Sequence, residues 1–206
     1  MPTLLANGGP VMWLIILAAA TAAVVFIERS LYCHRSQINS AEFLNGIRTV
    51  IKRGNVVEAI SICDATPGPV ARLVKAAILH REQGRDRVRE AVEEAGLTEV
   101  PRLEEKLNLL ATIAQISPLL GLFGTVVGFI RMFMNLQSAG LYAHISGDHS
   151  LAEGVWEALI CAAGGIAVAI PAHAGYNYLV SRVNKIVLDM ERAAAEIVNI
   201  VTENGK

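Results

Sequence analysis

The sequence predicts an all-α integral membrane protein with three transmembrane helices and long helical extensions in the cytoplasm. Hydrophobic residues make up 53% of the 206 residues, which is high for a soluble domain of this size. Three long runs contain no Asp, Glu, Lys or Arg, and a membrane helix needs about 20 apolar residues. The predicted transmembrane helices cover residues 11–30, 108–134 and 155–180. Polar segments with helical spacing lie between and after them.

Four segments follow from this pattern. We expect a first transmembrane helix in residues 1–30 and a cytoplasmic helical region in residues 31–106. Residues 107–180 are predicted to form the second and third transmembrane helices with a short periplasmic loop, and residues 181–206 a cytoplasmic helical tail that prolongs the third helix.

The composition excludes several classes of function. Lys and Arg number 18 against 19 Asp and Glu, so the formal net charge of -1 does not favour nucleic acid as a partner. No nucleophile–base pair, metal-ligand cluster or Gly-rich phosphate loop occurs, which argues against an enzyme, a cofactor or a bound metal. The cysteines fit no disulfide or metal spacing and are predicted to be small packing residues: Cys33, Cys63 and Cys161.

The first uncharged run, Val11 to Ile27, is short for a membrane span, but flanking residues extend it. Pro10 suits the first position of a helix, and Trp13 suits a membrane interface. No Lys or Arg precedes Arg29, so the run lacks the basic start of a secretory signal peptide. We therefore interpret it as a retained membrane helix.

The polar segment that follows carries several helix signals. Ser40 is predicted to cap a helix that runs to Gly54, and Asn55 with Glu58 forms a capping signature for a helix over residues 56–65.

A turn at residues 66–69 comes next, and apolar residues then recur at helical spacing up to Gly84. The charged stretch 85–94 is predicted to be a solvated helical face that Gly96 and Pro101 interrupt. Leu103 to Leu110 is expected to lead into the second span.

The second uncharged run, residues 108–130, combines a proline, three glycines and one notable hydroxyl, Thr125. Glycines spaced by four let a second helix approach closely, and a proline loosens the helix. The residues predicted to serve helix packing here are Pro118, Gly121, Gly124 and Gly128.

The third uncharged run, residues 158–180, follows a single carboxylate, Glu157. Ser150 with Glu153 forms a capping box, so we expect the helix to begin near Leu151 and to place Glu157 more than one turn inside it. Small or slim residues share its face, which marks close helix contact or a narrow pore: Cys161, Gly164, Val168 and Gly175. Gly164 and Pro171 are assigned to packing.

The distribution of Lys and Arg predicts the orientation. Thirteen of them lie in residues 28–106, four in residues 181–206 and one in the loop 131–154. Basic segments stay on the cytoplasmic side, so the N-terminus is predicted to be periplasmic and the C-terminus cytoplasmic. His144 and His149 in the loop are predicted to be solvated.

Glu157 and Thr125 are predicted to face each other. If the second helix ends near Met134, both lie ~10–14 Å in from their helix ends, at one level. A buried carboxylate beside a hydroxyl, with no fixed cation nearby, is expected to exchange protons near neutral pH. The alternatives are a solvated, inert Glu157 and a Thr125 hydroxyl that bonds its own backbone one turn back. The residues alone leave these alternatives open.

Two motifs carry a family resemblance. The stretch Ser117–Gly128 resembles the second-helix signature of the ExbB/TolQ/MotA ion-channel family. Glu157–Ile160, with residues 169–172 and 175–177, is similar to the third-helix signature of that family. Three spans with a large first cytoplasmic loop resemble the ExbB type most closely, because MotA-type stators have a further span.

The resemblance implies a motor subunit of the bacterial inner membrane. Such proteins form a homopentamer around a dimer of a single-span ExbD- or TolR-like partner, and proton flow drives a TonB- or TolA-like protein in the periplasm. On that basis Glu157 would be the proton-relay carboxylate and Thr125 a pore-lining hydroxyl. The expected role is to energise a TonB-type outer-membrane transport system. A TolQ-like or other MotA-family motor, and a non-conducting membrane scaffold, are the alternatives.

Three positions depart from the family pattern or extend it. Where the family commonly has a second pore threonine, this chain has Ala162, which favours H⁺ over Na⁺ because sodium needs several oxygen ligands. His173 replaces an apolar residue ~24 Å along the helix from Glu157 and either assists proton release or packs without function. Asn177 is expected to line the same exit.

Overall fold

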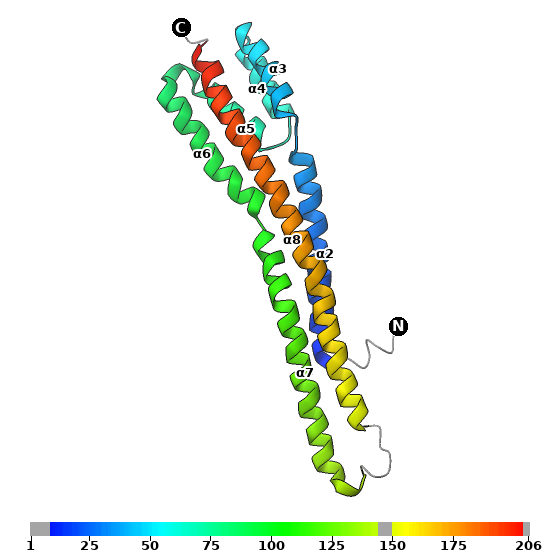
Figure 1. The fold of residues 1–206 in the computed structure, drawn as a ribbon. Helices are drawn as coiled ribbons and strands as arrows, with labels where there is room; N and C mark the ends of the chain where they lie inside the picture. The colour runs from blue at the N-terminus through cyan, green and yellow to red at the C-terminus, as the bar shows by residue number, and fades with distance from the viewer. Residues whose placement is uncertain (1–8, 144–149, 204–206) are drawn as a thin grey trace. The chain divides into compact units, whose positions relative to one another are not determined.

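The computed structural model describes residues 9–143 and 150–203, which are helical apart from short turns (Figure 1). No β-strand occurs in these two ranges, so the all-α fold class is confirmed. The helices are α2 (Gly9–Ser36), α3 (Ser40–Lys52), α4 (Val56–Ala65), α5 (Pro69–Leu79), the 3-10 helix η1 (Arg81–Gln83), α6 (Arg85–Glu104), α7 (Leu107–Ala143) and α8 (Ser150–Glu203).

Three helices are long and apolar enough to cross a membrane, and they contain the three predicted spans. These are α2, α7 and α8, of which α8 continues for 54 residues and includes the predicted helical tail. The chain is therefore a membrane protein with three candidate spans. Its periplasmic N-terminus and cytoplasmic C-terminus stay predictions. His144 and His149 lie outside the described residues, and so do the side chains of the predicted capping box at Ser150.

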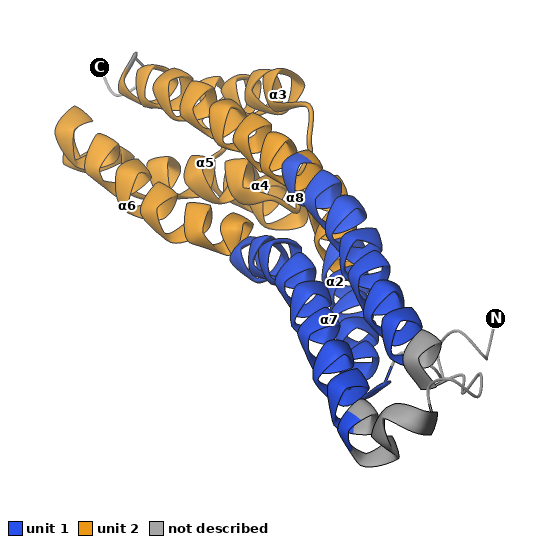
Figure 2. Ribbon diagram, turned by 60° about the horizontal axis from the view of Figure 1, so that its bottom comes forward, with its two compact units in different colours: residues 1–27, 106–177 blue, residues 28–105, 178–206 orange. Residues whose placement is uncertain are grey.

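The chain divides into two compact units (Figure 2). Unit 1 contains Met1–Ile27 and Lys106–Asn177, and unit 2 contains Glu28–Glu105 and Tyr178–Lys206. The four segments expected from the sequence have their boundaries at residues 30/31, 106/107 and 180/181. Unit 1 thus gathers the apolar runs, and unit 2 gathers most of the charged residues.

Glycines allow α7 and α8 to approach each other in unit 1. A Cβ atom on Gly121 would lie 2.9 Å from the carbonyl oxygen of Cys161, and one on Gly165 would lie 2.6 Å from that of Ser117. Further along α7, a Cβ on Gly128 would lie 3.1 Å from the Cβ atom of Ala158. The facing residue numbers fall on one helix as they rise on the other, so α7 and α8 are antiparallel. Their backbones meet where only glycine fits.

The third helix of unit 1, α2, packs against the same part of α8. Met12 and Ile15 lie beside Gly164, and Phe26 lies beside Gly175, so these two helices run parallel. Val11, Ile15 and Cys161 form the buried cluster between the helices. Parallel first and third helices with an antiparallel second helix is the arrangement that three successive crossings require.

Unit 2 corrects two expectations about its helix starts. Ser40 does not cap α3, because the Asn39 side chain accepts a hydrogen bond from the Glu42 amide and Ser40 is the first helical residue. Asn55 precedes α4 as predicted, but its side chain caps no backbone amide. It donates instead to the Glu58 carboxylate at 2.7 Å. The turn at residues 66–69 is present, with Gly68 at a φ of 127°.

The course of α6 also differs from the prediction. This helix continues through Gly96 and Pro101 without interruption. The chain breaks instead after Glu104, where Lys106 has a φ of 63°, so residues 103–110 do not form one continuous helix. Arg29, buried at 4% exposure, donates to the carbonyl oxygens of Arg102 and Leu103 at 2.7 and 3.2 Å. A distant guanidinium therefore satisfies the last carbonyls of α6.

The charges on α6 form a solvated face, as predicted. Arg87 pairs with Glu90 at 2.8 Å and Arg89 pairs with Glu93 at 2.8 Å, all on exposed side chains. Glu99 is the exception, because its buried carboxylate is held between Arg72 at 2.6 Å and Arg102 at 3.0 Å. The three cysteines are buried, as a packing role predicts.

Candidate functional site

The candidate site is an ion pair between α7 and α8 in unit 1. The Nη1 atom of Arg131 lies 2.7 Å from the Oε1 atom of Glu157. Arg131 directly follows the second uncharged run, and Glu157 directly precedes the third. The Glu157 side chain is 15% exposed and the Arg131 side chain 46% exposed. The carboxylate is therefore enclosed by the chain, while part of the guanidinium reaches the surface of unit 1.

The first helix of unit 1 closes the site from a third side. Gly9 begins α2 with a φ of 62°, a conformation that favours glycine. A Cβ atom at this position would overlap the Glu157 carboxylate and would lie 3.1 Å from Nη1 of Arg131. Glycine is thus required at residue 9 both for the backbone conformation and for the space. Each of α2, α7 and α8, the helices that the structure describes in unit 1, therefore contributes to the site.

The expectation that Glu157 has no fixed cation nearby was wrong. Arg131 already falls within the predicted second helix, residues 108–134, but the sequence does not give the register between that helix and the third. In the structure this register sets Arg131 on α7 against Glu157 on α8. The extension of α7 beyond Met134 also removes the assumption that set Thr125 and Glu157 at one level. One signal in the sequence could have found Arg131, because it is the single Lys or Arg between the two uncharged runs.

Thr125 lies six residues before Arg131 on α7, away from the ion pair. Its hydroxyl donates to the carbonyl oxygen of Leu122 at 2.6 Å, which is the backbone bond expected of an isolated membrane threonine. Gly124 and Gly128 lie beside Cys161 and Ala158, so Thr125 sits about one helical turn, ~6 Å, from the level of Glu157. The structure does not bring the hydroxyl and the carboxylate together within the chain.

The small residues that share a face with Glu157 line contacts between helices. A Cβ on Gly124 would lie 2.5 Å from the Cβ of Cys161, Gly164 faces α2 at Met12, and Gly175 faces α2 at Phe26. Of the two explanations offered for this face, close helix contact describes its role within one chain. Any aqueous passage must therefore use other faces of α7 and α8.

The remaining predicted site residues lie away from the ion pair. Ala162 is half-buried near Gly121, and its carbonyl oxygen would lie 3.2 Å from a Cβ there. His173 and Asn177 are exposed on α8, and the His173 ring centroid lies 6.4 Å from that of Tyr176. These side chains point to the surface of unit 1.

The two prolines that the sequence assigns to helix packing are also exposed. Pro118 lies within α7 and Pro171 within α8, and neither breaks its helix. Ser117, the neighbour of Pro118, is buried, and its hydroxyl donates to the carbonyl oxygen of Ile113 at 2.6 Å. Among the described residues, no group of three or more His, Cys, Asp or Glu is arranged to hold a metal ion.

Comparisons with known proteins cover this site. A family model described as the MotA/TolQ/ExbB proton channel family matches residues 65–192, which include Thr125, Arg131 and Glu157. A biopolymer transport protein ExbB homolog of Methanothermobacter thermautotrophicus is 27% identical over 179 residues, which cover 86% of this chain and 62% of that protein.

Two further relatives are similar to the chain. The Tol-Pal system protein TolQ of Haemophilus influenzae is 41% identical over 103 residues, covering 50% of this chain and 43% of that protein. The biopolymer transport protein ExbB of Neisseria gonorrhoeae is 24% identical over 209 residues, covering 93% of this chain and 92% of that protein. The chain thus spans less than two thirds of the length of the archaeal homolog and of TolQ.

Proposed function

The chain belongs to the MotA/TolQ/ExbB proton channel family, and on that premise we propose that it is the proton-conducting ring subunit of an inner-membrane motor. The proposed assembly is a homopentamer around a dimer of an ExbD- or TolR-like single-span protein. Relatives named ExbB cover more of this chain than TolQ does, which favours a role in energising a TonB-type outer-membrane transport system.

The ion pair of Arg131 and Glu157 carries the proposal. A carboxylate within a membrane-spanning segment costs free energy. Its presence beside two uncharged helical runs therefore points to a functional role. The guanidinium pairs with the carboxylate, and in the proposed cycle Glu157 exchanges a proton when this pair opens. A carboxylate on the partner protein would compete for Arg131 and open the pair. Half of the Arg131 side chain is exposed and within reach of such a partner.

The proposed cycle has three steps. The partner draws Arg131 away, Glu157 accepts a proton from the outer side, and closure of the pair returns the proton toward the inner side. Each charge that crosses the membrane supplies ~2.3 kcal/mol per 100 mV, which is sufficient for mechanical work when several protons pass. Thr125, His173 and Asn177 would line the path between subunits, because they lie on the surface of unit 1 rather than inside it.

Protons are the proposed ion. Sodium needs several oxygen ligands, and the surroundings of Glu157 provide few of them. Thr125 already donates to its own backbone, and Ala162 offers no hydroxyl. A single carboxylate that changes its protonation state needs no such ligand set.

Proton flux through vesicles reconstituted with the partner tests the proposal. Glu157→Gln keeps the shape of the side chain and removes its titration, so flux should fall to the level of empty vesicles. Glu191→Gln is the matched control, because it makes the same change at an exposed position of the same helix and should leave flux intact. Undiminished flux in Glu157→Gln would reject the proposal.

A non-conducting membrane scaffold is the second candidate. The ion pair between α7 and α8 also lies against the start of α2, and a static role of that kind needs no change in protonation. On this hypothesis the wild-type protein with its partner conducts no protons, and Glu157→Gln lowers stability only. A TolQ-like or other MotA-family motor conducts protons in the same way and is separated by the identity of the co-purifying partner.

A further inference from the structure

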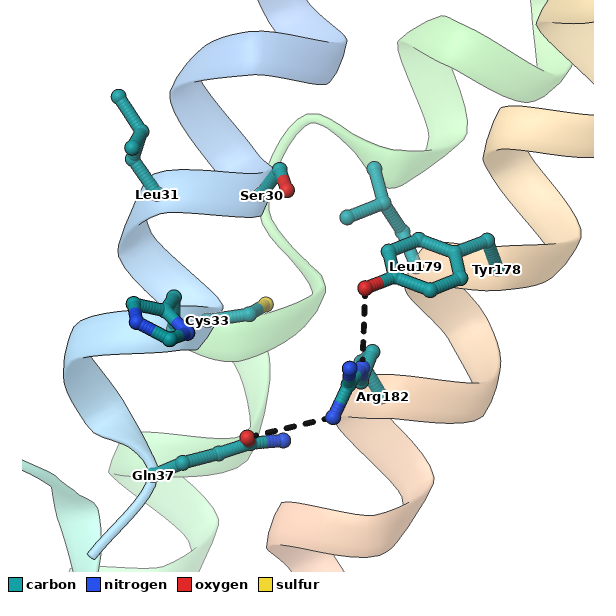
Figure 3. Close-up of a pocket in the computed structure, with 8 residues that line it drawn as sticks. Ser30, Leu31, Cys33, Gln37, Tyr178, Leu179 and Arg182 are labelled. Atoms are coloured by element: carbon teal, nitrogen blue, oxygen red, sulfur yellow. Dashed lines mark hydrogen bonds between the residues drawn. The ribbon is translucent and has the colours of Figure 1, made fainter.

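A pocket of about 140 Å³ lies in unit 2 between α2 and α8 (Figure 3). Polar side chains line it: Ser30 and His34 from α2, Gln37 directly after the end of α2, and Tyr178 and Arg182 from α8. None of the described residues that line the pocket is acidic. The pocket therefore presents donors and positive charge without a counter-charge of its own.

Arg182 is held in place at the pocket wall. Its Nε donates to the Tyr178 hydroxyl at 3.1 Å, and its Nη1 donates to Oε1 of Gln37 at 3.3 Å. Its Cζ atom also lies 5.3 Å from the centroid of the Tyr178 ring. The Nη2 group has no acceptor in the described part of the chain, and no carboxylate there pairs with Arg182. The guanidinium is thus positioned but not neutralised.

Gln37 orients Arg182 through one hydrogen bond. Because Arg182 can only donate, the amide oxygen of Gln37 accepts from its Nη1 atom. The Nε2 atom of Gln37 is buried and has no hydrogen-bond partner within the described ranges. Because this nitrogen is buried, it is not available to a group bound in the pocket. The donor that the pocket wall presents is therefore the Nη2 group of Arg182.

The pocket lies at the edge of the membrane-spanning runs. Ser30 lies three residues beyond Ile27, the end of the first uncharged run, or ~4 Å along α2. Gln37 directly follows Ser36, where α2 ends. On α8, Tyr178 and Arg182 lie on either side of Val180, the end of the third run. Tyrosine and arginine at this depth are typical of the headgroup layer of a bilayer.

We propose that this pocket binds a phosphate group, with Arg182 as its donor. The group is carried either by an anionic phospholipid headgroup or by free inorganic phosphate, and the position at the headgroup layer favours the lipid. An anionic headgroup fits better than phosphatidylcholine because the pocket offers no carboxylate for the choline cation. The inference does not depend on proton conduction.

Lipid binding to the purified full-length protein, measured by native mass spectrometry, tests this proposal. The probes are phosphatidylglycerol and phosphatidylcholine, each added to the detergent-solubilised protein, and inorganic phosphate as a competitor. The wild type should prefer phosphatidylglycerol by about fivefold or more, since one basic residue near an anionic headgroup contributes on that scale. Arg182→Gln should remove most of this preference.

Two further variants keep the test decisive. Gln37→Glu retains the acceptor for Arg182 and nearly the same shape, but it places a carboxylate beside the guanidinium that would bind the phosphate. It should abolish the preference even if Arg182→Gln does not fold. Arg192→Gln is the matched control, because it removes an exposed arginine three turns further along α8 and should change binding by less than about twofold.

Each outcome decides the proposal. Loss of phosphatidylglycerol binding in both pocket variants, with Arg192→Gln unaffected, supports it. Displacement of the lipid by inorganic phosphate, itself dependent on Arg182, assigns free phosphate as the source. Equal phosphatidylglycerol binding by the wild type, Arg182→Gln and Gln37→Glu overturns the proposal.

Discussion

Nη1 of Arg131 lies 2.7 Å from Oε1 of Glu157, and the backbone of Gly9 lies against the same carboxylate. These three residues come from α7, α8 and α2, so the ion pair between α7 and α8 also lies against the start of α2. The charge of Glu157 is enclosed, and its counter-charge comes from a side chain that is half exposed.

Arg131→Gln should destabilise unit 1 because it leaves the enclosed carboxylate without its counter-charge. We expect a loss of about 1 to 2 kcal/mol, which is less than a fully buried pair would cost, since Arg131 is half exposed. Thermal unfolding in detergent, followed by circular dichroism, measures it. The double variant Arg131→Gln/Glu157→Gln should recover much of the loss, and strict additivity of the two single changes would show that the residues do not interact.

Gly121→Ala should separate α7 from α8. The new Cβ would lie 2.9 Å from the Cys161 carbonyl oxygen and 3.2 Å from the Cα of Gly165, and backbone atoms cannot move aside cheaply. We expect a destabilisation of about 1 to 3 kcal/mol in the same unfolding assay. Gly96→Ala is the control, because no atom lies within 4 Å of its Cβ and it lies inside α6. That change should stabilise the protein by up to about 1 kcal/mol, and equal effects of the two variants would contradict the packing argument.

Thr125→Val should reduce proton flux less than Glu157→Gln. The hydroxyl already bonds the Leu122 carbonyl, so its loss removes a polar group from the surface of unit 1 without unpairing a charge. Ala162→Thr adds a hydroxyl and should introduce a dependence of flux on Na⁺. Flux is measured in vesicles with H⁺ or Na⁺ gradients. A Thr125→Val variant as inactive as Glu157→Gln would place Thr125 in the proton relay itself.

Burial raises the pKa of the Cys63 thiol to about 11, and the nearby charge of Asp64 adds to this effect. The folded protein should therefore keep this thiol protonated and slow to react with iodoacetamide at neutral pH. Because the folded-state pKa lies above the model value of 9.0, this contribution to stability is complete below pH 9.0 and is lost as the pH rises toward 11. Cys63→Ala should remove the part of the stability loss at alkaline pH that comes from ionisation of this thiol. Mass spectrometry of iodoacetamide-treated protein measures the reactivity of the thiol.

Much of the fold follows from the sequence because uncharged runs of 17 and 23 residues leave few alternatives to membrane helices. The turn at Gly68 and the helix that follows it can also be predicted from the sequence, since Pro and Gly restrict or release the backbone at their own positions. The same local logic failed at Gly96 and Pro101, which a packed helix tolerates. It also failed at Lys106, where the chain leaves the helical conformation although no Gly or Pro is present at that position.

The candidate site was only half predictable. A lone carboxylate beside an uncharged run identified Glu157. Its partner could not be identified because contact between Arg131 and Glu157 depends on how far α7 continues and on its register with α8. That register is set by close approaches such as the one between Gly128 and Ala158. The role of Gly9 has no local signature either, since it depends on a side chain 148 positions away.

The contact at Gly9 has a practical consequence for labelling. A fusion tag joined directly ahead of α2 would lie next to the Glu157 carboxylate, because Gly9 begins that helix at this contact. The far end of α8 lies 46 residues from Glu157, ~69 Å along the helix. Fluorophores and purification handles attached after α8 will therefore report on the protein without crowding its acidic group.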